Sequence, residues 1–128
     1  MTSDDVWDLL ELVASIDRRK VGLTDRQTWA MLVGDLPAAD AKAAVLAHYR
    51  ESREWLMPAD VRRRVKEARR ERILDAGIPA PPPELADDPA AYGAALQAAA
   101  AAIADGRDPE AAMRAIARQS SRPELEAS

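Results

Sequence analysis

The sequence predicts an all-α fold: a compact four-helix N-terminal bundle, a Pro-rich linker and a marginal alanine-rich C-terminal helical hairpin. Apolar residues recur three and four positions apart, and the alternation typical of strands is missing. Prolines stand where helices can begin, and four of them fall in one short segment. We therefore expect a helical bundle domain at 1–75, a linker at 76–88, a hairpin at 89–118 and a disordered tail at 119–128.

The first expected helix covers residues 3–19. Thr2 or Ser3 offers an N-cap, acidic residues follow in the first turn, and basic residues close the helix, as the helix dipole favours. Gly22 interrupts the pattern. The side chains that fall on one face of this helix are Val6, Leu9, Leu10, Val13 and Ile16.

The second expected helix covers residues 25–36 and opens with a capping box formed by Thr24 and Gln27. Pro37 starts a third helix and Pro58 a fourth, which runs to about Leu74, because proline is tolerated in a first helical turn. The inward positions of the second and third helices are Trp29, Leu32, Val33, Leu36, Ala41, Ala44, Val45, His48 and Tyr49.

The C-terminal part contains a near-repeat, DPAAYGAAL from Asp88 and DPEAAMRAI from Asp108. In each copy Asp is a plausible N-cap and Pro the first helical residue. The alanine-rich helices have high propensity but little apolar area to bury, so the hairpin is expected to be marginal on its own. Its larger apolar residues are candidates for binding a partner protein: Tyr92, Leu96, Ile103, Met113 and Ile116.

The composition argues against an enzyme. The chain has no cysteine and a single histidine, which excludes thiolate and His-rich metal sites. It contains no glycine-rich phosphate loop, Gly-x-Ser-x-Gly elbow or HExxH motif, so we expect no catalytic residue, cofactor or metal. No apolar run approaches the roughly 20 residues of a membrane span, and the acidic N-terminus is unlike a secretory signal. We expect a cytoplasmic protein that does not bind membranes.

The single histidine, the N-terminal aspartates and the tryptophans could each have a functional role, but we favour a structural role for them. His48 lies on the apolar stripe of the third helix, which indicates a core or boundary histidine more than a catalytic one. The carboxylates of Asp4, Asp5 and Asp8 resemble a metal cluster, but acidic residues are ordinary in a first helical turn. Tryptophans can stack on nucleic-acid bases, but we favour structural roles for all three. Trp7 is expected at the boundary of the core and Trp29 inside it. Trp55 is expected to close the gap between the third and fourth helices.

The fourth helix carries an unusual charge. The net charge of the whole chain is -4, but residues 58–74 hold seven basic and three acidic side chains. Val61, Val65 and Ala68 form a narrow packing face, and the rest of the surface is cationic. Three interpretations stay open: local ion pairs such as Arg63–Glu67, an acidic protein partner, or DNA phosphates without base readout. The candidate nucleic-acid-binding residues are Arg62, Arg63, Lys66, Arg69 and Arg70.

Residues 28–65 contain a Trp at the start of a short helix, a Leu–Pro turn, an Ala-rich helix with a His–Tyr end, and a Pro–x–Asp–Val helix start. These positions are Trp29, Leu36–Pro37, Ala44–Val45, His48–Tyr49 and Pro58–Ala59–Asp60–Val61. With this pattern the segment resembles the N-terminal domain of phage proteins that load, and in free form inhibit, the replicative DnaB-type helicase. The resemblance implies a compact helical body, a tail that contacts the helicase, and no catalytic residues. It also implies a host-cell cytoplasm and an origin-binding protein as a further partner.

The first hypothesis is therefore a non-enzymatic phage DNA-replication accessory protein that binds the replicative helicase. In it, the basic helix at 58–74 makes an auxiliary contact with the phosphate backbone. The alternatives are a small helix-turn-helix transcriptional regulator and a structural protein-interaction module. The long segment between the third and fourth helices disfavours the regulator, because the turn of that motif normally has 3–4 residues.

Overall fold

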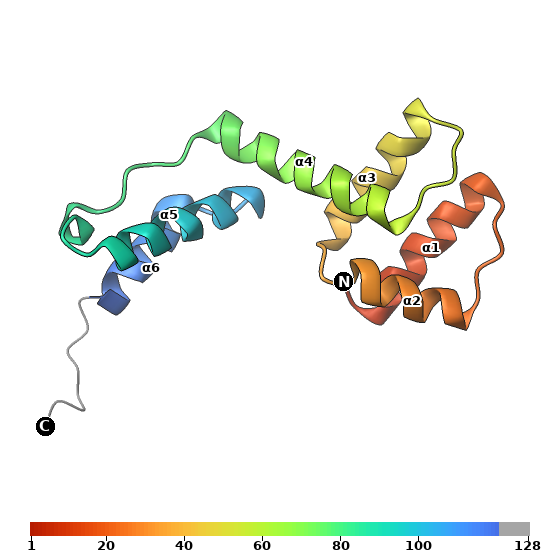
Figure 1. The fold of residues 1–128 in the computed structure, drawn as a ribbon, viewed down its shortest axis with the longest axis horizontal. Helices are drawn as coiled ribbons and strands as arrows, with labels where there is room; N and C mark the ends of the chain where they lie inside the picture. The colour runs from red at the N-terminus through yellow and green to blue at the C-terminus, as the bar shows by residue number, and fades with distance from the viewer. Residues whose placement is uncertain (121–128) are drawn as a thin grey trace, which may run out of the picture. The chain divides into compact units, whose positions relative to one another are not determined.

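A computed structural model describes residues 1–120 of the chain. These residues form six α-helices and one short 3-10 helix, and no strand occurs among them. The prediction of an all-α fold is confirmed for this part of the chain. The chain divides into two compact units, Met1–Ala68 and Arg69–Ser128, and Figure 1 shows the helices of each unit in chain order. Each unit has its own apolar core.

The first helix, α1 (Ser3–Asp17), is closed at its start by a capping box. The Thr2 hydroxyl accepts the Asp5 amide at 3.1 Å, and the Asp5 carboxylate accepts the Thr2 amide at 2.9 Å. Of the two predicted caps the structure uses Thr2. The helix ends at Arg18, whose φ of 65° lies in the left-handed region. This conformation turns the chain into the loop that leads to the second helix.

The second helix, α2 (Leu23–Val33), begins two residues earlier than predicted. Its first turn does not use Thr24 and Gln27; the amide of Gly22 donates instead to the Asp25 carboxylate at 2.8 Å. Gly22 is the N-cap, a position at which glycine is among the favoured residues, and Asp25 satisfies its amide; this explains the earlier start. The helix ends at Gly34, where a Cβ atom would stand 2.3 Å from the Ala30 carbonyl oxygen.

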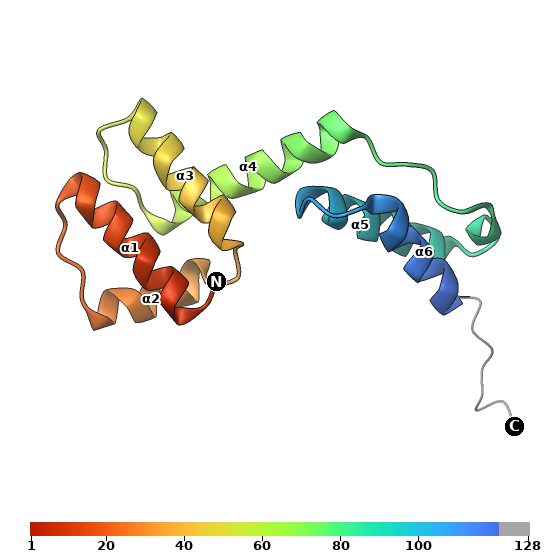
Figure 2. The same cartoon turned by 180° about the vertical axis from the view of Figure 1, so that it is seen from behind.

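The third and fourth helices are α3 (Ala38–Glu51) and α4 (Pro58–Ala76). Helix α1 packs against both α2 and α3, as the two views agree (Figures 1 and 2). Apart from Trp29, the core of the N-terminal unit is made of aliphatic side chains: Val6, Leu9, Leu10, Val13, Val33, Ala41, Ala44, Val45, Leu56, Val61 and Val65. Since the chain has no phenylalanine, aliphatic burial supplies most of the hydrophobic stabilisation.

Several predicted core positions differ in the structure. Ile16 is 40% exposed and Leu32 48% exposed, although both follow the helical period. Ala68 is also exposed. Trp55 was expected to pack between the third and fourth helices, but it is 57% exposed. Its neighbour Leu56, in the loop between α3 and α4, is completely buried instead. Periodicity alone does not tell which apolar residue of a face meets a neighbouring helix, and this explains the differences.

The segment 76–88, expected to be a linker, contains a short helix and a buried side chain. Pro83–Leu85 forms a 3-10 helix, and Leu85 is 1% exposed in the core of the C-terminal unit. The division between the compact units falls inside α4, at Ala68/Arg69, and not at the proline-rich segment. The segment is therefore part of the C-terminal unit, because Leu85 anchors it.

The remaining helices are α5 (Pro89–Ala104) and α6 (Pro109–Ser120), which pack against each other. The Asp88 carboxylate caps α5 by accepting the Ala91 amide at 3.1 Å. Their shared core contains Leu85, Ala95, Ala99, Met113 and Ala117. Residues 119 and 120 of the predicted disordered tail belong to α6, and residues 121–128 lie outside the described residues.

Candidate nucleic-acid and protein interfaces

Helix α4 exposes most of its cationic side chains, because its buried residues are only Val61 and Val65. Arg62 nevertheless makes a two-armed ion pair with Asp35, with nitrogen–oxygen distances of 2.6 and 3.1 Å. It also donates to the Leu32 carbonyl at 3.0 Å. These bonds tie α4 to the end of α2 and lower the pKa of Asp35, which is stabilised as a carboxylate by the hydrogen bonds from Arg62.

Two other arginines of α4 also form ion pairs within the chain. Arg63 contacts Asp60 at 3.2 Å and Glu67 at 4.0 Å, the latter a predicted pair. Arg64 contacts Glu51 at 3.0 Å. Charge on this helix is therefore partly compensated by acidic groups that lie on the same helix or on α3.

Arg69 belongs to the C-terminal unit. Its guanidinium contacts the Asp105 carboxylate at 2.6 Å and the Ala104 carbonyl at 3.4 Å. Hydrogen bonds from Arg69, and then from Arg107, lower the pKa of Asp105. This carboxylate is 36 positions from Arg69 in the sequence, which is why sequence periodicity does not reveal the pair.

Three of the five candidate nucleic-acid-binding residues, Arg62, Arg63 and Arg69, thus form ion pairs within the chain. Lys66 and Arg70 are exposed and make no ion pair with any of residues 1–120. The cationic surface of α4 that is available to an outside ligand is therefore smaller than the sequence indicates.

A second polar cluster, which the sequence did not reveal, joins the ends of α1 and α3. Arg19 and Asp17 form an ion pair at 2.6 Å, and their side chains are only 9% and 4% exposed. The Tyr49 hydroxyl donates to Asp17 at 2.5 Å and accepts the Leu56 amide at 3.0 Å. Arg19 also donates to the Leu56 carbonyl at 2.9 Å. We call these four residues the Arg19 cluster; it holds the loop 52–57 against the end of α1.

The electrostatics of the Arg19 cluster follow from these bonds. Burial opposes ionisation of Asp17, but hydrogen bonds from Arg19 and Tyr49 outweigh it and lower the pKa of this carboxyl group. Burial, followed by the bond to Asp17, raises the pKa of Tyr49. Asp17 is therefore an ionised acceptor and Tyr49 a neutral donor at neutral pH.

His48 lies beside this cluster and is 6% exposed, which confirms its expected place in the core. Its Nε2 atom is 2.6 Å from the Glu54 carbonyl oxygen and donates to it. The bond joins the last turn of α3 to the loop 52–57. A structural role for His48 accounts for this geometry.

Acid should unfold the protein because several carboxyl groups have lowered pKa values in the fold. For such groups the stabilisation is present above the unfolded pKa, close to 4, and is lost as the pH falls through the folded value. We expect a melting temperature that is nearly constant from about pH 5 to pH 7 and falls below about pH 4. The groups concerned are Asp5, Asp17, Asp35, Asp60 and Asp105.

Thermal melts followed by circular dichroism across this range test the expectation. Asp17→Asn should be less stable than the natural sequence at neutral pH, and its melting temperature should fall less steeply in acid. A parallel pH dependence in both proteins would contradict the role given to Asp17.

The five candidate partner-binding residues of the C-terminal unit fall into two groups. Met113 is 1% exposed and Ile103 is 9% exposed, so both are buried in their own unit and not presented to a partner. Leu96 and Ile116 are half-buried and pack against the core, while Tyr92 is 40% exposed. Helices α5 and α6 pack against each other around a shared core, and this explains the burial.

No family model, no curated protein and no solved structure matches the chain. Its function must therefore be argued from its own residues.

Three further structural findings bear on the function classes. In the range 1–120 no three His, Asp or Glu side chains gather as a metal site, and no helix is long and apolar enough to cross a membrane. Helices α3 and α4 are joined by residues 52–57, a connection longer than the 3–4-residue turn of a helix-turn-helix motif.

Proposed function

We propose that the chain is a non-enzymatic DNA-replication accessory protein that binds a DnaB-type replicative helicase, as a loader or an inhibitor. The observation that carries the proposal is the division of the chain into two compact helical units, each with its own core. Such a division suits an adaptor, because one unit can hold one partner while the other holds a second. The class of partner comes from the resemblance of residues 28–65 to helicase loaders.

The residues that carry this resemblance support the proposal through their positions. Trp29, Ala44, Val45 and Val61 are all buried in the N-terminal unit. Tyr49 belongs to the Arg19 cluster. The pattern therefore coincides with the architecture of this unit and leaves its surface open to partners such as an origin-binding protein.

The proposed helicase contact lies on the C-terminal unit. Among its residues up to Ser120, the large exposed apolar side chains are Leu74, Ile78 and Tyr92, with exposed fractions of 69%, 42% and 40%. Tyr92 is followed by half-buried Leu96 one turn later on the same face of α5. Apolar anchors on a helix are a common way to dock into a partner groove, and aromatic residues often dominate the binding energy.

Binding of the full-length protein to purified DnaB-type helicase hexamers tests this function. We expect Tyr92→Ala combined with Leu74→Ala to weaken binding at least about tenfold, since hot-spot side chains contribute more than about 1.4 kcal/mol. Gln97→Ala is the matched control, because Gln97 is exposed on α5 and is not apolar. Biolayer interferometry measures the dissociation constants.

Two results would contradict the proposed helicase binding. Equal affinity of the double variant and the natural sequence would refute the contact at Leu74 and Tyr92. Failure of the natural sequence to bind any of several bacterial helicases would refute the helicase function. The auxiliary phosphate contact of α4, now limited to Lys66 and Arg70, is tested together with the site below.

A further inference from the structure

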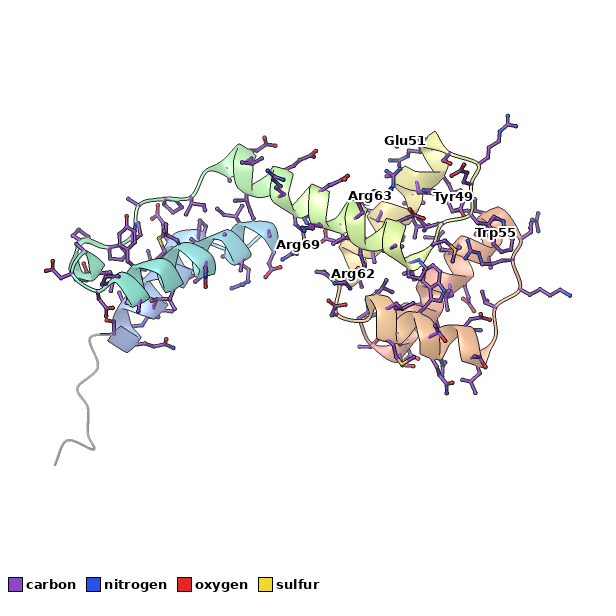
Figure 3. The ribbon with its side chains drawn as sticks, viewed as in Figure 1. Tyr49, Glu51, Trp55, Arg62, Arg63 and Arg69 are labelled. Atoms are coloured by element: carbon purple, nitrogen blue, oxygen red, sulfur yellow. The ribbon has the colours of Figure 1, made fainter. Side chains whose placement is uncertain are left out.

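One end of the N-terminal unit carries exposed cations on neighbouring segments. The segment 18–22 joins α1 to α2, and the segment 52–57 joins α3 to α4. The Arg19 side chain holds them together, since it donates to the Leu56 carbonyl at 2.9 Å and lies 4.6 Å from the centre of the Trp55 ring. Tyr49 and Trp55 mark this end in Figure 3. We call residues 18–20 and 50–55 the loop end.

The cations of the loop end differ from those of α4. Four are exposed and form no ion pair within the described part of the chain: Arg18, Lys20, Arg50 and Arg53. Two nearby carboxylates are already used, because Asp17 pairs with Arg19 and Glu51 with Arg64. Glu54 is the remaining acidic side chain of the loop end. Four cations against one carboxylate leave a local positive surplus on a chain whose net charge is -4.

The loop end also presents an aromatic side chain. Trp55 is 57% exposed, although Arg19 lies over its ring. The Arg19 cluster fixes the guanidinium through Asp17 and the Leu56 carbonyl, so the indole rests on an ordered support. The buried Leu56 next to it holds the loop down. An exposed indole held among unpaired cations is a typical combination in sites for single-stranded nucleic acid.

We propose that the loop end binds single-stranded nucleic acid: its cations contact backbone phosphates and Trp55 stacks on a base. Single strands are favoured over duplexes because stacking requires an unpaired base. The cations recognise phosphate and not base edges, so the site is expected to be tolerant of sequence. The proposal does not rest on helicase binding, and it moves the main nucleic-acid contact from α4 to the loops.

Fluorescence anisotropy of a labelled oligothymidine of about 15 nucleotides tests the proposal with the full-length protein. We expect binding that weakens steeply between about 20 and 200 mM salt. Lys20→Glu/Arg53→Glu should reduce affinity by about tenfold or more. The matched control is Lys42→Glu/Arg114→Glu, at two exposed cations outside α4 and the loop end, which changes the net charge equally and should reduce affinity less than about threefold. Lys66→Glu/Arg70→Glu tests the auxiliary contact of α4 and should have an effect between those of the other two variants.

Trp55 offers an independent readout. We expect Trp55→Ala to weaken binding about tenfold, and Trp55→Phe to keep most of the affinity because a phenyl ring still stacks. Intrinsic tryptophan fluorescence of the natural protein should be quenched by the oligonucleotide, and this quenching should be lost in Trp55→Phe. Circular dichroism melts show whether each variant is folded.

Several outcomes would overturn the proposal. They are no binding at the lowest salt, an equal loss in Lys20→Glu/Arg53→Glu and in the control Lys42→Glu/Arg114→Glu, and tighter binding to a duplex of the same length. Binding of polyglutamate with the same affinity, together with unchanged affinity in Trp55→Ala, would identify the loop end as a surface for acidic proteins instead. Each result is independent of whether a helicase binds the C-terminal unit.

Discussion

Replacing Arg19 by alanine should lower the free energy of unfolding of the N-terminal unit by about 3–5 kcal/mol, the usual cost of breaking a buried ion pair by removing one partner. The variant leaves the Asp17 carboxylate buried without its guanidinium partner. It also removes the bond that Arg19 donates to the Leu56 carbonyl. For a unit of this size the loss is comparable with the whole stability, which is about 0.05–0.15 kcal/mol per residue.

Urea unfolding followed by tryptophan fluorescence measures this effect selectively, because Trp7, Trp29 and Trp55 all lie in the N-terminal unit. Lys20→Ala is the control, since Lys20 is exposed in the same loop and the expected change is within about 0.5 kcal/mol. Tyr49→Phe should be intermediate, because it removes the hydroxyl shared by Asp17 and Leu56 but keeps the ion pair. Similar midpoints for Arg19→Ala and Lys20→Ala would show that the Arg19 cluster contributes little.

Replacing Leu85 by alanine should destabilise the C-terminal unit by about 2–5 kcal/mol, the range for truncating a buried leucine. Leu85 is 1% exposed and packs in a core that otherwise consists mainly of alanines and Met113. Few large side chains share this core, so the surrounding helices have little with which to fill the cavity. The loss is therefore expected to release the proline-rich segment from α5 and α6.

The two units are followed separately in this experiment. Circular dichroism reports helices of both units, whereas tryptophan fluorescence reports the N-terminal unit alone. Leu85→Ala should lower the urea midpoint of part of the dichroism signal and leave the fluorescence midpoint unchanged. Glu84→Ala, an exposed neighbour in the same 3-10 helix, is the control. An equal shift of both signals would contradict a separate C-terminal core.

Ion pairs within the chain decide which cationic side chains are available to bind nucleic acid. The sequence concentrates basic residues in α4, but Arg62, Arg63 and Arg69 find acidic partners within the chain. Counting charges along a helix overestimates its free cations whenever carboxylates from other elements reach it. The loop end shows the reverse, because its basic residues are scattered in the sequence and gather only when α1 and α3 end side by side.

The sequence by itself determined the helical class and most helix starts. Pro58 stands at the first position of α4, and Asp88 caps α5 before Pro89, since these residues act on the backbone within one turn. It also indicated the buried places of Trp29 and His48, because a residue on the apolar stripe of an amphipathic helix is turned toward the core.

Only the tertiary structure decided which groups meet across the chain. It placed Leu56 in the core and Trp55 at the surface, although both stand in one loop with no period to separate them. It paired Arg62 with Asp35, 27 positions away, and Arg69 with Asp105. The Arg19 cluster joins three segments in the same manner. Local preferences act over a turn of helix, whereas ion pairs and burial depend on distances in space that the packing of the helices sets.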